Sequence, residues 1–160
     1  MSAEHEPGAV GSPRPPRLRE LTSEQCWTLL AAQEVGRLGV TAERYPMIFP
    51  VNYAVDHEVI IVRTGPGTKL TAASHANVAF EVDHLDAVTR TGWSVLVLGL
   101  AEEVTDQHRQ EVLERTLAAG VRAWAPGERD HYLRIIPHRV SGRWIEPGEL
   151  PPAFEAAGYL

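Results

Sequence analysis

The sequence predicts a mainly β protein, an antiparallel barrel with two or three peripheral helices. About seven short runs of β-branched or alternating apolar residues are spread along the chain. The connections between these runs are short, which favours antiparallel neighbours over the long crossovers of a parallel sheet. Gly and Pro recur between the runs, as turn residues do. Closing such a sheet into a barrel leaves it without free edges.

The chain divides into one domain between two tails. Residues 1–17 are rich in Pro and Gly and nearly lack apolar side chains, so we expect a flexible N-terminal tail. Residues 147–160 contain three prolines and predict a second, loosely packed tail. Residues 18–146 remain as the domain, and a chain of 160 residues suits a single hydrophobic core.

Composition excludes several classes of protein. A net charge of −6 argues against a nucleic-acid partner, since such proteins usually present a basic face. No run approaches the roughly 20 apolar residues of a membrane span, and no apolar signal core is present at the N-terminus, so we expect a cytoplasmic protein. The single cysteine, Cys26, allows neither an intrachain disulfide nor a Cys-rich zinc site.

The first predicted element is a helix from about Ser23 to Glu34. Thr22 is a suitable N-cap, and Gln25 follows three residues later, which is the pattern of a capping box. Two further helices are expected, a short one over residues 69–75 and a longer one that Thr105 caps, running to about residue 119 before Gly120.

The predicted strands follow the first helix at close intervals. Pro50 favours an edge or a bulge over a central position, because proline cannot donate to a neighbouring strand. Asp56 and His57 form a tight hairpin turn, and Gly99 marks a bend or bulge in a long strand. The strands are expected over residues 35–41, 46–55, 58–64, 77–83, 92–104, 131–136 and 139–146.

The loop Gly65–Leu70 is the strongest candidate for a binding site. Its two glycines allow a tight turn with exposed N–H groups, Thr68 offers a hydroxyl, and a helix begins at the same place. Fourteen of the fifteen basic residues are Arg, so the only lysine, Lys69, stands out as a compact cation. These features favour a bound phosphate, although a plain turn before a helix cap also explains them; the glycine spacing is not that of a Walker loop.

Three residue pairs near this loop are further candidates for contacts with a ligand. Arg63 and Thr64 end the preceding strand, where an Arg can reach an anion or simply be solvated. The amide of Asn52 and the phenol of Tyr53 can form hydrogen bonds with the edge of a heteroaromatic ring. The indole of Trp93 can stack on a flat ring, and the hydroxyl of Ser94 can donate to a phosphate or a ring oxygen. Ordinary packing in the barrel also explains these side chains.

The order of these motifs resembles the pyridoxamine 5′-phosphate oxidase-like family of flavin-binding split barrels. The resemblance covers about residues 21–146 and rests on several motifs in the same order and spacing. They are Val35-Gly36-Arg37-Leu38, Pro50-Val51-Asn52-Tyr53, Arg63-Thr64-Gly65-Pro66-Gly67-Thr68-Lys69-Leu70, Phe80-Glu81-Val82-Asp83, Gly92-Trp93-Ser94-Val95 with Gly99, and Ser141-Gly142-Arg143.

The resemblance implies a split barrel that forms a homodimer, with a flavin mononucleotide (FMN) in each of two interface clefts. Arg63, Thr64, Thr68 and Lys69 fall where the family holds the phosphate and ribityl chain. Asn52 and the neighbouring main chain fall where the family meets the isoalloxazine ring. Trp93 and Ser94 match the strand that closes over the cofactor, often from the partner subunit.

The sequence also departs from the biosynthetic oxidases of that family. Those enzymes carry basic residues on the second strand, where this chain has Phe49 and Ala54, and their C-terminal substrate segment is not evident. Oxidation of a vitamin B6 phosphate is therefore not expected.

Three functions remain open. The first is an FMN-dependent oxidoreductase acting on an unidentified small molecule, and the second is a reductase using the deazaflavin F420. The third is a non-catalytic flavin-binding or sensing protein. No residue can be assigned as general acid or base, because the histidines fit surface or turn positions and qualify by type only. They are His57, His75, His84 and His131.

Overall fold

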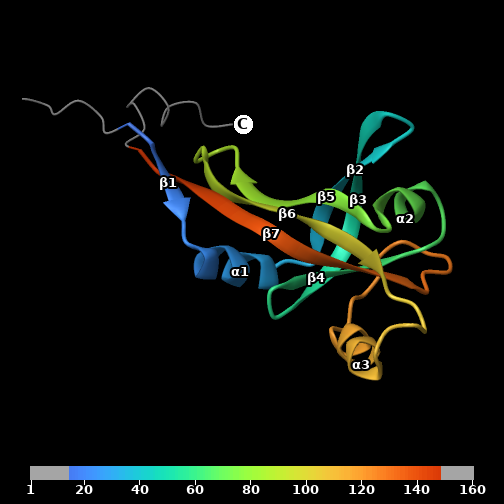
Figure 1. Cartoon of the computed structure of the whole chain (residues 1–160). Coiled ribbons are helices and arrows are strands. Elements are labelled where there is room, and N and C mark those ends of the chain that lie inside the picture. Colours follow the sequence, from blue (N-terminus) through green and yellow to red (C-terminus); the bar gives the residue numbers. More distant parts are fainter. Residues whose placement is uncertain (1–14, 149–160) are drawn as a thin grey trace, which may run out of the picture.

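Seven antiparallel strands form one sheet that closes on itself, and three helices lie at its periphery (Figure 1). The computed structural model describes residues 15–148. The strand order is β1-β7-β4-β3-β2-β5-β6, and β6 also pairs with β7, which completes a ring. The predicted antiparallel split barrel is thereby confirmed. The elements are β1 Arg17–Leu21, α1 Ser23–Ala31, β2 Val35–Ala42, β3 Tyr45–Asp56, β4 Val59–Thr64, α2 Thr68–Ala73, β5 Ala76–Asp86, β6 Thr91–Glu103, α3 Gln110–Ala118 and β7 His131–Glu146.

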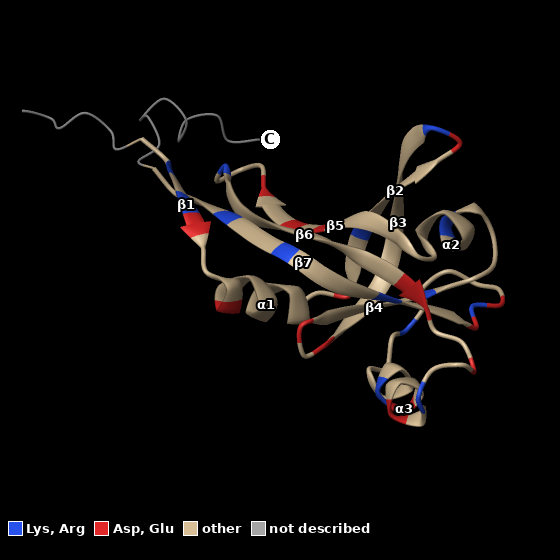
Figure 2. Ribbon diagram, viewed as in Figure 1, with Lys and Arg blue, Asp and Glu red and all other residues tan. Residues whose placement is uncertain are grey.

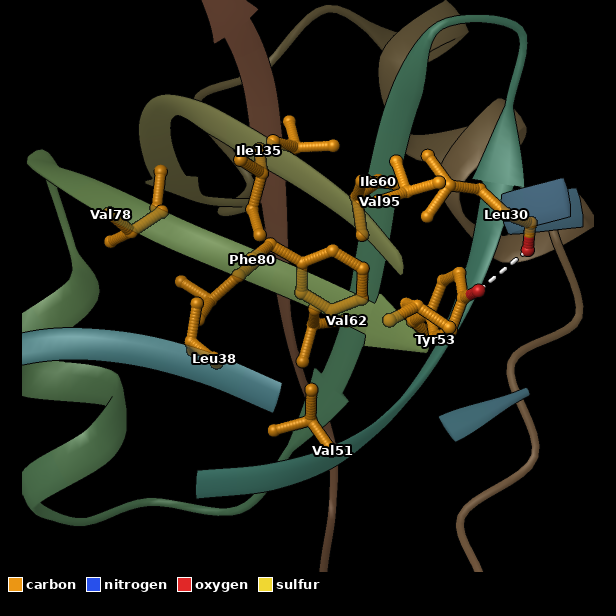
Figure 3. Packing of buried hydrophobic residues seen from close by; sticks show 14 of the residues in the cluster. Leu30, Leu38, Val51, Tyr53, Ile60, Val62, Val78, Phe80, Val95 and Ile135 are labelled. Atoms are coloured by element: carbon orange, nitrogen blue, oxygen red, sulfur yellow. Dashed lines mark hydrogen bonds between the residues drawn. The ribbon is translucent and has the colours of Figure 1, made fainter. Parts of the chain in front are cut away.

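The interior of the ring is filled by alternate residues of the strands, as Figure 3 shows. On β2 every second residue from Gly36 to Ala42 is buried, because strand side chains alternate between faces. Tyr53 packs edge-to-face on Phe80, with ring centroids 4.8 Å apart. The Tyr53 hydroxyl donates to the carbonyl of Leu30 at 2.6 Å. This hydrogen bond connects α1 to the barrel.

Local sequence signals place several elements correctly. The capping box at α1 is present, with Thr22 Oγ1 accepting from the main-chain N–H of Gln25 and the Gln25 side chain accepting from Thr22. Pro50 lies where β3 pairs with β2 alone, since β4 pairs only with the later part of β3. The register of β6 shifts between Leu98 and Gly99, which confirms the predicted bulge.

Other elements differ from the prediction. β1 is a strand that the sequence pattern did not predict. It begins at Arg17, the last residue of the predicted tail, and pairing with the far end of β7 holds it as a strand. The last two predicted strands are one continuous strand, β7, because the bulge at Gly99 accommodates Pro137 and leaves His138 without an opposite residue. A Cβ at Gly99 would lie 2.3 Å from the Ile136 carbonyl oxygen, so this crossing requires glycine.

The helix and turn boundaries also need correction. Helix α1 ends at Ala31 and not at Glu34, since residues 32 and 33 already form tighter turn bonds. Helix α3 begins at Gln110, and Thr105 is not its cap: the Thr105 N–H instead donates to Nδ1 of His108 in a separate turn. The β3–β4 turn falls at residues 57 and 58, one later than predicted. Among the predicted tails, residues 1–14 and 149–160 lie outside the described residues.

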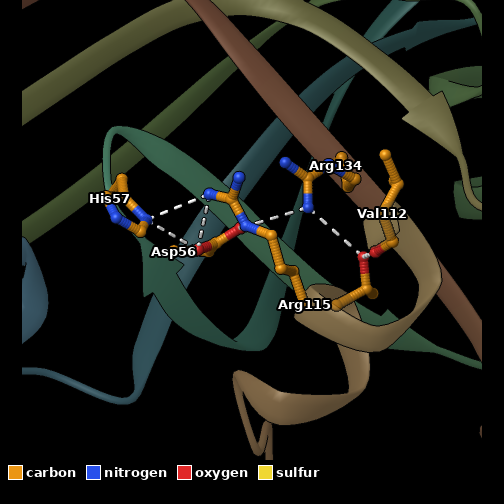
Figure 4. A network of polar contacts seen from close by, with 6 residues as sticks. Asp56, His57, Val112, Arg115 and Arg134 are labelled. Carbon is orange, nitrogen blue, oxygen red and sulfur yellow. Dashed lines mark hydrogen bonds and ion pairs between the residues drawn. The ribbon is translucent and has the colours of Figure 1, made fainter. Parts of the chain in front are cut away.

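A polar network holds α3 against the barrel, as Figure 4 shows. Both carboxylate oxygens of Asp56, at the end of β3, accept from the guanidinium of Arg115 on α3 at 3.0 and 3.1 Å. Arg134 of β7 donates to the same carboxylate at 3.3 Å and to Thr116 Oγ1 at 3.3 Å. This network fixes the start of the segment that follows α3, residues 119–130, which runs back toward β7.

Charged residues are spread over the outside of the barrel in both signs (Figure 2). On the outer face of β2 and β5, Arg37 forms ion pairs with both Glu81 and Asp83. Within the part of the chain that the structure describes, no helix has the length and apolar character needed to cross a bilayer.

Candidate functional site

The loop between β4 and α2 provides open space beside a cation. Gly67 has a φ of +134°, a conformation that glycine adopts readily, and a Cβ built there would meet no atom within 4 Å. The next residue, Thr68, is exposed at the first position of α2. The loop therefore presents main-chain groups and a hydroxyl to solvent, as the prediction of an anion site requires.

Lys69 lies half-buried directly after this loop. Its Nζ stands 5.9 Å from the centre of the Phe49 ring, a cation–π geometry. Burial first, and then the nearby charge of Arg129, lower the pKa of Lys69. No carboxylate among residues 15–148 forms an ion pair with it. The ammonium is thus partly desolvated, close to another cation and not neutralised by the protein.

Arg63 joins β4 to the segment of residues 119–130. Its Nε donates to the carbonyl of Arg129 at 2.7 Å, and its guanidinium lies 5.7 Å from the centre of the Tyr132 ring. The carboxylate of Asp130 approaches Nη2 only to 3.8 Å, and that side chain is 81% exposed. Arg63 is therefore held in place mainly by a carbonyl group, and its positive charge is only weakly compensated.

Asn52 is linked to the same segment from the neighbouring strand. Its Oδ1 accepts from the main-chain N–H of Trp124 at 2.9 Å, and its Nδ2 donates to the carbonyl of Glu34 at 3.4 Å. Both ends of the amide are thus engaged within the chain. The Trp124 side chain is 70% exposed. Asn52 therefore positions an exposed indole, and a ligand that uses its amide must share these bonds.

Two predicted residues of this group face the interior. Tyr53 is 3% exposed and bonded to Leu30, and Thr64 is 1% exposed, with its hydroxyl donating to the carbonyl of Gly65 at 3.2 Å. Their side chains serve the core and the start of the loop. A ligand-binding role for these two side chains stays a prediction that no exposed atom supports.

Trp93 and Ser94 lie far along β7 from Arg63 and from the loop that follows it. Ser94 pairs with Arg143 near the end of β7, whereas Arg63 pairs with Tyr132 near its start. The eleven positions from Tyr132 to Arg143 span roughly 35 Å along the strand, at about 3.3 Å per residue. In Figure 1, α2 and β1 accordingly lie at opposite ends of β7. One chain does not bring the eight predicted residues together around one small ligand.

The outer faces of β6 and β7 form a polar groove at that second end. Its volume is about 470 Å³, and Ser94 lines it together with Ser141, Arg139, Arg143 and, from β1, Glu20. Trp93 is not part of the groove lining and is only 7% exposed, so its ring belongs to the core. Within residues 15–148 neither of the two arginines forms an ion pair.

Sequence reasoning missed the contribution of residues 119–130. Arg129 and Trp124 stand among Gly, Pro and acidic residues, which is the composition of an ordinary solvated connection. The hydrogen bond that reveals Arg129 joins it to Arg63, 66 positions away, so no local pattern in the sequence predicts this contact.

Comparison with known proteins agrees with the fold. The family model described as pyridoxamine 5′-phosphate oxidase matches residues 22–144. The uncharacterized protein Rv0080 of Mycobacterium tuberculosis is 36% identical over 129 residues, which cover 77% of this chain and 82% of that protein.

Two solved structures are also similar. The FAD-binding protein of Mycobacterium smegmatis is 32% identical with a TM-score of 0.61, covering 80% of this chain and 98% of that one. A FAD-binding protein of Mesorhizobium loti is 28% identical with a TM-score of 0.65, covering 82% and 99%.

Proposed function

The chain belongs to the pyridoxamine 5′-phosphate oxidase family, and from this premise we propose that it binds a flavin nucleotide with its phosphate at residues 65–69. One observation carries the proposal: Lys69 and Arg63 stand beside an open glycine loop with little compensating negative charge. A phosphate would supply that charge through charge-assisted hydrogen bonds. The exposed Thr68 hydroxyl adds a further donor.

The two solved relatives that are named FAD-binding support a flavin-type cofactor. FMN, FAD and F420 all carry phosphate, so the cation cluster alone does not choose among them. We retain FMN as the first expectation and F420 as the alternative, because F420 needs a longer basic groove and Lys69 is the only lysine of the chain.

A bound flavin supplies hydride or electron transfer, and the protein supplies binding and orientation. Here Lys69, Arg63 and Thr68 would hold the phosphate, while Asn52 and the segment it positions would border the ring. We therefore propose a flavin-dependent oxidoreductase acting on an unidentified small molecule. A non-catalytic flavin-binding protein is the second candidate, favoured by the lack of any assigned acid or base.

We further propose that the functional unit is a homodimer. Ser94 and its groove lie roughly 35 Å along β7 from the loop at residues 65–69, so a second copy is the simplest way to bring both to one ligand. Arg139 and Arg143 form no ion pair within residues 15–148 and outnumber the one carboxylate of that groove, Glu20, so the groove suits a face that meets an anionic ligand. Such pairing is reciprocal in a twofold dimer and gives two equal sites.

The first test is the identity of the bound cofactor. Purified full-length protein is examined by absorption spectrum and by mass spectrometry of the released small molecule, which distinguishes FMN, FAD and F420. If the protein is purified without a cofactor and then binds none of the three when FMN, FAD and F420 are added, the proposed function is wrong.

The second test removes the lysine. Lys69→Ala should weaken flavin affinity by about 10- to 150-fold, equivalent to about 1.5–3 kcal/mol for a hydrogen bond to a charged group. Arg109→Ala is the matched control, since this exposed residue at the start of α3 lies outside the loop. Equal flavin content in Lys69→Ala and wild type would contradict the assignment of the loop.

The third test concerns the dimer. Light scattering should give twice the 17.6 kDa of one chain. A flavin-loaded protein that remains at 17.6 kDa would contradict the shared site.

A further inference from the structure

The segment of residues 119–130 brings another cation to the loop that we propose as the phosphate site. It leaves α3, passes Asn52 and Arg63, and enters β7 at His131. Its path brings it against the glycine loop, because a Cβ added to Gly65 would lie 2.7 Å from the carbonyl oxygen of Glu128. Glycine at this position therefore permits two main chains to approach closely.

Arg129 occupies the centre of this contact. Its carbonyl accepts from Arg63 at 2.7 Å, and its own Nε donates to the carbonyl of Ala125 at 3.1 Å. Its Cγ would stand 4.0 Å from a Cβ at Gly65, so the side chain passes alongside the loop. The position of this arginine is thus fixed by hydrogen bonds at both its main chain and its side chain.

The charge of Arg129 has no ionic partner in the part of the chain that the structure describes. It is close enough to Lys69 to contribute to the lowered pKa of that lysine. Arg63, Lys69 and Arg129 therefore gather three positive charges, and among residues 15–148 only the exposed carboxylate of Asp130, 3.8 Å from Nη2 of Arg63, forms an ion pair with any of them. Like charges held together in this way raise the energy of the empty site and favour a multivalent anion.

We propose that Arg129 is a phosphate-binding residue of the flavin site, and that it selects phosphorylated flavins over riboflavin. The inference rests on the proposed function and adds to it a residue outside the motifs of the sequence. Arg63 links the two parts, because it belongs to β4 and binds the main chain of Arg129 directly. The segment then forms a third wall of the site, beside the loop and α2.

The selectivity follows from the ligand charges. FMN carries a phosphate that bears close to two negative charges at neutral pH, and riboflavin is the same ring and ribityl chain without it. A residue that contacts the phosphate affects FMN binding only. A residue that merely supports the fold of the segment, and with it the ring pocket near Asn52, affects both ligands.

The experiment compares FMN and riboflavin binding to cofactor-free, full-length protein by flavin fluorescence titration. Arg129→Gln should weaken FMN binding by about 10- to 100-fold and leave riboflavin binding within twofold. Arg129→Lys should retain most of the FMN affinity, because it keeps the charge. Arg122→Gln is the matched control, since Arg122 lies in the same segment but pairs with Glu34 at 3.1 Å; it should leave FMN binding within a few-fold of wild type.

The outcomes separate the two proposals. If wild-type protein takes up none of FMN, FAD and F420, the proposed function fails and the role of Arg129 fails with it. If wild type binds FMN, but Arg129→Gln binds it equally well or loses FMN and riboflavin to the same extent, only the assignment of Arg129 is overturned.

Discussion

Replacing Asp56 by Asn should destabilise the protein at neutral pH and have almost no effect in acid. Asp56 is the carboxylate that joins β3 to α3 and β7, and its side chain is only 11% exposed. Burial alone would raise its pKa. The hydrogen bonds from Arg115 and His57, the charge of Arg115 and the hydrogen bond from Arg134 outweigh burial and lower the pKa from 3.8 to about 2.

The size of the effect follows from linkage. A folded-state pKa about 1.8 units below the unfolded value corresponds to roughly 2 kcal/mol of stability, at about 1.4 kcal/mol per unit. Because the folded pKa is the lower one, this stabilisation is complete above about pH 5 and is lost as pH falls through 3.8 toward about 2. Asp56→Asn should therefore lose about 2 kcal/mol at pH 7, and its curve should converge with that of wild type near pH 2.

Urea unfolding followed by circular dichroism at several pH values measures this difference. Protein concentration must be kept constant, since association would add to the apparent stability. Asp130→Asn is the matched control, because that carboxylate is 81% exposed and lies 3.8 Å from a single guanidinium; it should change stability little at any pH. A deficit in Asp56→Asn that stays the same from pH 7 to pH 2.5 would refute the reasoning.

Three other substitutions or reactions test the core. Tyr53→Phe removes the hydroxyl that donates to the Leu30 carbonyl, which keeps the weaker bond from the Gln33 N–H at 3.3 Å, and should cost about 0.5–1.5 kcal/mol in urea unfolding; an unchanged midpoint would contradict the 2.6 Å bond. Gly36→Ala places a Cβ 2.4 Å from Cζ of Phe80 and should lower stability by about 1–3 kcal/mol, whereas a wild-type melting temperature would argue against this packing. Cys26 is 1% exposed with a pKa raised by burial, so a thiol reagent should label it only as fast as the protein unfolds; rapid labelling of native protein would disprove its burial.

Local signals in the sequence were sufficient for much of the fold. The capping box at Thr22 and Gln25 and the alternation along β2 each depend on residues within a few positions of one another. The bulge at Gly99 was predictable for a related reason: glycine inside a strand commonly marks a close main-chain approach, here that of Ile136.

The errors occur where distant partners decide the structure. Arg17–Leu21 has no strong strand pattern, yet it forms β1 because the far end of β7 pairs with it. Pro137 interrupts the apparent strand in the sequence, but β7 continues past it, because a bulge at His138, opposite Leu98 and Gly99 of β6, accommodates it. In both places the neighbour lies more than 35 positions away, beyond the reach of periodicity.

The candidate site divides in the same way. The loop with Thr68 and Lys69 is contiguous in sequence, and its glycines and lone lysine identify it without a structure. Arg129 reaches that loop only through the barrel, by way of its bond to Arg63.

The length of β7 links the fold to the proposed dimer. This strand pairs with β4 near one end and with β1 at the other, so it separates the loop after β4 from the groove beside Ser94. Both regions hold arginines without ionic partners in the described chain, at Arg129 and at Arg143, and both therefore suit an anionic ligand. In the proposed dimer, each loop at residues 65–69 would face the partner's groove, so the length of β7 that separates the two regions within one subunit would bring them together between two.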